Sequence, residues 1–231
     1  MPSAVIMKGS LRLPSTGVVA LQAGIGHAGT MRLHVIPHST NVDRVSLALG
    51  LKGRTAERVL HPTADRSGVR AVSGQDLVPV LETPEGGVLP GSMAIVDWID
   101  ATWPDPPLYP AGAAGRREVE GFVTFFDHLW KVAPNAIADG TADAAGTANG
   151  IAQLRGWRHG FEALLTGRDF LFGDAPGAAD VCAHPFLRYA TSSDPGDDDL
   201  FHGVLIEHLA LDGAFPNLAA WIARVAALPH A

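Results

Sequence analysis

Cysteine is nearly absent from this chain of 231 residues, which contains only Cys182. One cysteine cannot form an internal disulfide and cannot supply a four-thiolate zinc site. The composition therefore fits a reducing compartment, and we expect a cytoplasmic protein.

Positive charge is also scarce. Lysine and arginine together number 17 against 24 aspartates and glutamates, so the net charge is −7 and the densest charged cluster, residues 194–199, is acidic. Nucleic acids and anionic membrane surfaces are bound by basic faces, and the sequence has no basic stripe. No apolar run reaches the roughly 18 residues that suggest a membrane span. We therefore expect no nucleic-acid partner and no membrane partner.

The motifs of several enzyme classes are missing as well. The chain has no Gly-x-Ser-x-Gly elbow, no P-loop and no His-Glu-x-x-His zinc motif. Two pairs spaced by four residues, Asp180 with His184 and His34 with His38, have no third ligand near them in the sequence. A metal site is therefore not expected.

The most informative segment that is present covers residues 75–102. An apolar run contains Val78-Pro79, and a proline without an N–H belongs at a sheet edge, at a bulge or in a cis peptide bond. Gly86-Gly87 predicts a hairpin turn after which a short strand returns. Ser92 can then cap a helix. The side chains expected on the buried face of that helix follow helical spacing: Ile95, Trp98, Ile99 and Thr102.

This series of strand, Val-Pro step, hairpin and Gly-Ser helix start resembles the thiol-binding domain of the glutathione S-transferase family. The resemblance implies a thioredoxin-like fold in which Val78-Pro79 is cis and offers backbone groups to the thiol. It also implies that Ser92 holds the γ-glutamyl carboxylate of glutathione, which suits the free N–H groups and dipole of a helix N-terminus. Relatives usually have an acidic residue before this serine, whereas this chain has Gly91. Another small thiol is therefore an alternative to glutathione.

The resemblance places the catalytic corner at the turn between the first strand, residues 32–36, and the helix that follows it. Counting back six positions from Val45, Ser39 occupies the position of the catalytic serine or cysteine. A hydroxyl aimed at sulfur would favour the thiolate form of the bound thiol. The alternative is that Ser39 is an ordinary helix cap. The supporting candidates around it are a base, a substitute hydroxyl and an orienting amide: His38, Thr40 and Asn41.

The order of the predicted elements defines the fold class. A β-α-β unit, a hairpin and a helix predict an α/β thioredoxin-like domain over residues 31–102, after a loosely ordered leader over residues 1–30. A proline-rich linker covers residues 103–112. Helical periodicity continues through residues 113–231 and predicts an all-α helical bundle domain. There the segment 170–180 resembles the turn by which relatives enter their central helix.

Three aromatic residues at helical spacing in the second domain, Phe122, Phe126 and Trp130, are candidates for the wall of an electrophile pocket. The alternative is that such a stripe belongs to the core. The resemblance predicts a homodimeric enzyme that activates a small thiol, glutathione first, for attack on a hydrophobic electrophile. A thiol-dependent isomerase or lyase on the same scaffold is an alternative. A catalytically silent ligand-binding or interaction protein is another.

Overall fold

The computed structural model describes residues 29–231, so the predicted leader lies outside the described residues except for its last two positions. The first domain contains a mixed sheet with the strand order β2-β1-β3-β4. Strand β1 (Arg32–Val35) pairs in parallel with β2 (Glu57–Leu60) and antiparallel with β3 (Val80–Glu82). Strand β3 pairs antiparallel with β4 (Val88–Pro90). This is the thioredoxin-like sheet that the sequence predicts.

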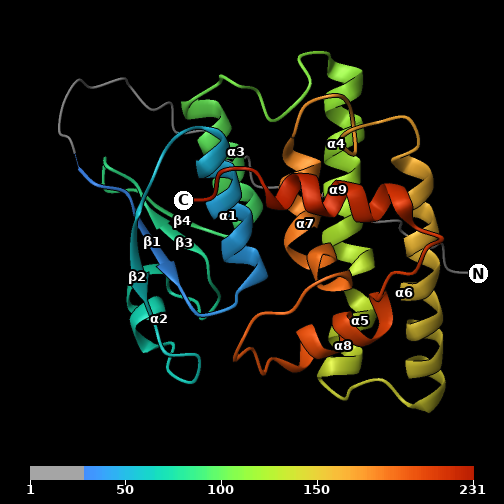
Figure 1. The fold of residues 1–231 in the computed structure, drawn as a ribbon. Helices are drawn as coiled ribbons and strands as arrows, with labels where there is room; N and C mark the ends of the chain where they lie inside the picture. Colours follow the sequence, from blue (N-terminus) through green and yellow to red (C-terminus); the bar gives the residue numbers. More distant parts are fainter. Residues whose placement is uncertain (1–28) are drawn as a thin grey trace, which may run out of the picture.

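Two helices of this domain separate the sheet from the second domain, as Figure 1 shows. They are α1 (Thr40–Leu51) and α3 (Ser92–Thr102), which pack against each other. The short helix α2 (Ser67–Ser73) lies beyond the sheet. The predicted buried face of α3 needs a correction, because Thr102 is exposed and Val96 is buried in its place. The helix ends at Thr102, and Ile99 is the last of its residues to be buried.

The second domain is helical throughout the residues that the structure describes. Its elements are α4 (Ala113–Phe125), the π-helical turn η1 (Phe126–Trp130), α5 (Val132–Ala138), α6 (Ala144–Leu164), α7 (Ala178–Leu187), the 3₁₀ turn η2 (Arg188–Ala190), α8 (Leu200–Leu209) and α9 (Pro216–Ala226). Helix α7 is central in Figure 1, and all of its residues are buried. It contacts α1 across the domain boundary, so the two domains share one core. No helix within residues 29–231 is both long enough and apolar enough to span a bilayer.

Helix α6 begins earlier than the small residues near its start suggest. We expect a flexible segment up to Gly150, but the helix starts at Ala144. Asp143 caps it by accepting a hydrogen bond from the N–H of Gly146 at 2.7 Å. An ideal Cβ on Gly150 would lie 3.1 Å from Ile137 of α5, so the small residue permits close packing of two helices.

The π-helical turn between α4 and α5 prepares the functional site. A π turn carries an additional residue in the helix, and such turns are frequent at functional sites. Phe126 and Trp130 point into the core and stack with ring centroids 4.4 Å apart. Asp127 and Lys131, each one residue further on, contact α1 of the first domain instead. The turn thus separates an apolar pair from a charged pair along one helix.

Candidate active site

A pocket of about 460 Å³ opens between the start of α3, the first turns of α1 and the π-helical turn. The residues on which its chemistry depends come from both domains: Asn41, Arg44, Val78, Ser92, Asp127 and Lys131. Three of these, Asn41, Val78 and Ser92, are candidates from the sequence. The pocket therefore joins segments that are up to 90 residues apart in the chain.

The Val78-Pro79 peptide bond is cis, as the resemblance predicts, and this is one of the three placements of the proline that the sequence alone left open. Val78 lines the pocket, and neither its N–H nor its carbonyl oxygen has a hydrogen-bond partner among residues 29–231. A free donor and a free acceptor on one extended residue can pair with the backbone of a bound peptide.

Ser92 lies at the pocket, but the prediction that it caps α3 is wrong. The cap is Gly91, at φ 91°, a left-handed conformation that favours glycine, and Ser92 is the first helical residue. The Ser92 hydroxyl accepts a hydrogen bond from Arg44 Nη1 at 3.2 Å. The backbone N–H groups of Ser92, Met93 and Ala94 have no partner within the helix and line the same pocket.

Ser39 caps α1 by accepting a hydrogen bond from the N–H of Val42 at 3.3 Å. The capping alternative is therefore confirmed, and a catalytic role for the same hydroxyl stays a prediction. Ser39 is half-buried and does not line the pocket, whereas Asn41, two residues later, does. The substitute hydroxyl of Thr40 is only 5% exposed.

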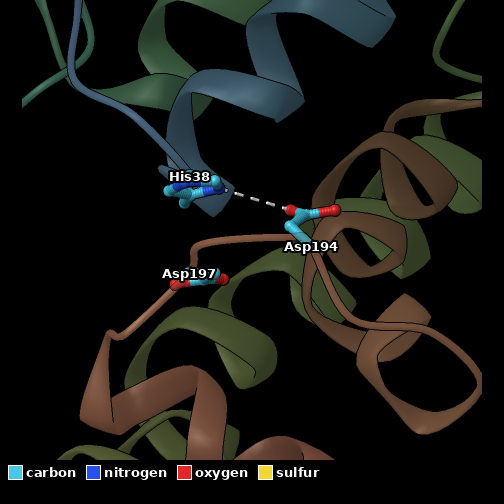
Figure 2. A group of neighbouring side chains, drawn as sticks. All are labelled: His38, Asp194 and Asp197. Carbon is cyan, nitrogen blue, oxygen red and sulfur yellow. Dashed lines mark ion pairs between the residues drawn. The ribbon is translucent and has the colours of Figure 1, made fainter.

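His38 occupies the left-handed region at φ 56°, which few residues with a side chain adopt. Its Nδ1 lies 3.7 Å from Asp194 Oδ2, and Asp197 is close by, as Figure 2 shows. His38 has no third ligand near it in the sequence, but the acidic loop folds back onto it in the structure, which the sequence did not predict. Both carboxylates are engaged by the protein, Asp194 by Arg188 and Asp197 by the Tyr189 hydroxyl at 2.8 Å. Arg188 also lowers the pKa of Asp194. The group is therefore a contact between the two domains.

Arg44 connects the pocket to the second domain and is completely buried. Its Nε donates to the carbonyl oxygen of Cys182 at 2.8 Å, and its Nη2 donates to Asp127 Oδ1 at 2.8 Å. Its Nη1 reaches Ser92 Oγ and, at 3.3 Å, Asn41 Oδ1. A planar guanidinium suits this role because its donors point in fixed directions. No functional role for Arg44 was predicted from the sequence.

Asp127 and Lys131 are the functional candidates that sequence reasoning missed. Lys131 Nζ donates to Asp127 Oδ1 at 3.1 Å and to Asn41 Oδ1 at 3.3 Å. Burial acts to raise the pKa of Asp127, but Arg44 and Lys131 outweigh it, so the pKa is lowered and the group is a carboxylate. Burial, reinforced by Arg44, lowers the pKa of Lys131 to about 8 although Asp127 opposes the shift. The sequence contained a signal for this pair, because Asp127 and Lys131 are opposite charges spaced by four residues and lie beside the aromatic residues of the same helical segment.

Two of the three aromatic residues predicted to line an electrophile pocket lie in the core instead. Phe126 and Trp130 have no exposed surface and belong to the core, so the prediction that they face an electrophile is corrected. Large apolar rings at helical spacing bury most area when they face neighbouring helices. Phe122 is half-buried and its ring centroid lies 5.4 Å from that of Phe172. Its place beside a substrate stays a prediction.

A thioredoxin-like domain, a helical domain on the far side of α1 and α3, and a pocket between a cis-proline step and the start of a helix together define the architecture of a glutathione S-transferase. Comparison with known families agrees. Residues 33–107 match the model described as "Glutathione S-transferase, N-terminal domain", and residues 147–224 match "Glutathione S-transferase, C-terminal domain".

Individual relatives extend the match. Maleylpyruvate isomerase from Ralstonia sp. is 30% identical over 176 residues, which cover 69% of this chain and 82% of the relative. Maleylacetoacetate isomerase from Pseudomonas aeruginosa is 26% identical over 184 residues, covering 69% and 81%. A structure of maleylacetoacetate isomerase from Anaeromyxobacter dehalogenans, described with glutathione in its active site, superposes with a TM-score of 0.62 at 23% identity, covering 86% and 91%. The chain belongs to the glutathione S-transferase family and is an enzyme of that kind.

Proposed function

We propose that this enzyme binds glutathione in the pocket at the start of α3 and uses its thiolate to isomerise an unsaturated carboxylic acid. The observation that supports thiol binding most strongly is the pocket itself. There the backbone of Val78, which has no hydrogen-bond partner within residues 29–231, lies together with the hydroxyl of Ser92 and the first N–H groups of α3. The names of the relatives favour isomerisation of a maleyl compound.

The residues divide the binding of glutathione between them. The backbone of Val78 pairs with the cysteinyl part of the tripeptide, and the start of α3 with Ser92 receives the γ-glutamyl carboxylate. The sulfur then lies toward the first turn of α1, where Ser39 donates its hydroxyl to it. A free thiol has a pKa near 8.5, so a donor and a helix N-terminus beside the sulfur increase the thiolate fraction at neutral pH.

The reaction conserves glutathione. The thiolate adds to one carbon of a double bond conjugated with a carbonyl group, forming a C–S bond and moving the π electrons onto the carbonyl oxygen. Rotation about the resulting single bond follows. The electrons then return, the C–S bond breaks, and the trans alkene and the thiolate are released. Conjugation to a hydrophobic electrophile begins with the same attack but keeps the C–S bond.

Substitution of Ser39 tests the proposal, with a matched control for its capping role. We expect Ser39→Ala to keep its affinity for glutathione, to lose roughly 1 kcal/mol of stability with the cap, and to lose about 100-fold or more in turnover of maleylpyruvate. Ser39→Asp caps a helix as well as serine does, but its carboxylate donates no hydrogen bond, so it should be stable and at least equally slow. Full turnover in Ser39→Asp would refute the role of Ser39. Failure of the wild type to bind glutathione would refute the function.

A further inference from the structure

The floor of the pocket contains more hydrogen-bond donors than acceptors. Arg44 Nη1, Lys131 Nζ and Ser92 Oγ all approach one neutral acceptor, Asn41 Oδ1, at 3.3, 3.3 and 3.4 Å. These distances exceed the usual upper limit of about 3.2 Å for a good hydrogen bond. The three donors therefore make only long hydrogen bonds to this amide oxygen. An incoming anion could accept shorter and stronger hydrogen bonds from them.

The charges around the pocket are also unbalanced. Arg44 and Lys131 are cations, and Asp127 is the one carboxylate among the described residues that line the pocket. Arg44 is completely buried and depends on Asp127, which is 2.8 Å from it. Lys131, whose side chain is 15% exposed, lies at 3.1 Å from the same oxygen. Among residues 29–231, Lys131 therefore has no carboxylate that it does not share with Arg44.

The pocket has little to offer a ligand's ammonium group. Residue 91 is glycine, so no carboxylate precedes Ser92 at the start of α3 to receive it. The negative charge of Asp127 is already shared between two cations, and an ammonium group would be a third. An ammonium group also meets the free N–H groups of α3, which repel a cation.

We propose that Lys131 is a specificity-determining residue that pairs with the ligand's carboxylate at the start of α3, and that this pocket recognises the carboxylate of a thiol without requiring its ammonium group. This inference rests on the proposed function and defines its ligand class. Lys131 and Ser92 contact the same Asn41 oxygen, so a carboxylate held by Ser92 lies within reach of Lys131. The class comprises carboxylate-bearing thiols, with or without an amino group.

Three ligands separate these features: S-methylglutathione, its analogue in which glutaryl replaces γ-glutamyl and thus lacks only the amino group, and its analogue in which the γ-glutamyl α-carboxylate is an amide. Their dissociation constants are measured by calorimetry at pH 6.5 on the wild type, Lys131→Met and Lys131→Arg. We expect the ligand without the amino group to bind within about threefold of S-methylglutathione. The amide should bind about 10- to 100-fold more weakly, the range of a charged hydrogen bond.

The variants assign the carboxylate contact. Lys131→Met should bind S-methylglutathione about 10-fold or more weakly and lose most of its preference over the amide, and Lys131→Arg should restore part of both. Each preference is the ratio of the dissociation constants of two ligands on the same protein. A substitution that weakens the binding of both ligands equally therefore leaves this ratio unchanged. Arg155→Met, an exposed helical cation, is the control and should match the wild type.

Each outcome decides the question. A 10-fold or greater loss on removing the amino group would overturn the inference and indicate that Asp127 binds the ammonium. An unchanged preference for the carboxylate in Lys131→Met would also overturn it. If no ligand binds the wild type, the proposed function fails with it, whereas binding without these preferences refutes the inference alone.

Discussion

Arg44 offers the sharpest test of how the two domains hold the pocket together. In Arg44→Met a flexible apolar side chain of similar length replaces the guanidinium. The buried carbonyl oxygen of Cys182 then loses its 2.8 Å partner, at a cost of about 1–3 kcal/mol. Breaking a buried ion pair costs about 3–5 kcal/mol. The cost should be smaller here, because the side chain of Asp127 is 24% exposed and keeps Lys131.

We therefore expect Arg44→Met to lose about 3 kcal/mol of unfolding free energy, the two costs being partly offset by the methionine that fills the space. At roughly 2–4 °C per kcal/mol for a chain of this size, the thermal midpoint should fall by about 6–12 °C. Calorimetry and urea unfolding measure both quantities. Arg155→Met should stay within about 0.5 kcal/mol of the wild type. A loss below 1 kcal/mol in Arg44→Met would refute the view that this residue joins the domains.

Two further predictions follow from pKa shifts. Lys131 has a pKa of about 8, so it is charged below that pH and neutral above it. The glutaryl analogue of S-methylglutathione, which has neither a thiol nor an amino group to titrate, should therefore bind more weakly as the pH rises through about 8, and calorimetry across pH 6.5 to 9.5 should show a flat profile for Lys131→Met. Burial raises the pKa of the Cys182 thiol to about 11 and leaves it no exposed surface. A chromogenic disulfide should therefore react with Cys182 of the folded enzyme about 100-fold or more slowly than with Cys182 of the denatured chain. The denatured chain should release one equivalent of the coloured thiolate from the reagent. Rapid labelling in native buffer would contradict this prediction.

Most of the fold could be predicted from the sequence, because its signals are local. Strand β1 (Arg32–Val35) lies within one residue of the expected range, residues 32–36, and α1 and β2 follow it in the expected β-α-β order. In the last helix, α9, Leu218, Trp221, Ile222 and Val225 are buried, as their spacing indicates. Such periodicity results from one element packing on one surface.

The candidate site was less accessible to sequence reasoning, because its contacts join distant segments. Val78 and Ser92 could be found through the motif that contains them. Asp127 contacts a residue of α1 that is 83 positions away in the sequence, and Lys131 contacts one that is 90 positions away. The periodicity of a single helix carries no information about contacts between segments so far apart. The contact between the acidic loop and His38 could not be predicted for the same reason, since it too joins distant segments of the chain.

The π-helical turn at Phe126–Trp130 determines which way the following residues point. Successive residues of an α-helix are rotated by about 100°, so one extra residue turns everything after it by that angle. Deleting one residue here would turn α5 on its axis and direct Lys131 away from Asn41, while α4 keeps its orientation. The positive charge that faces the pocket thus depends on the additional residue in the π-helical turn as much as on the presence of a lysine at position 131.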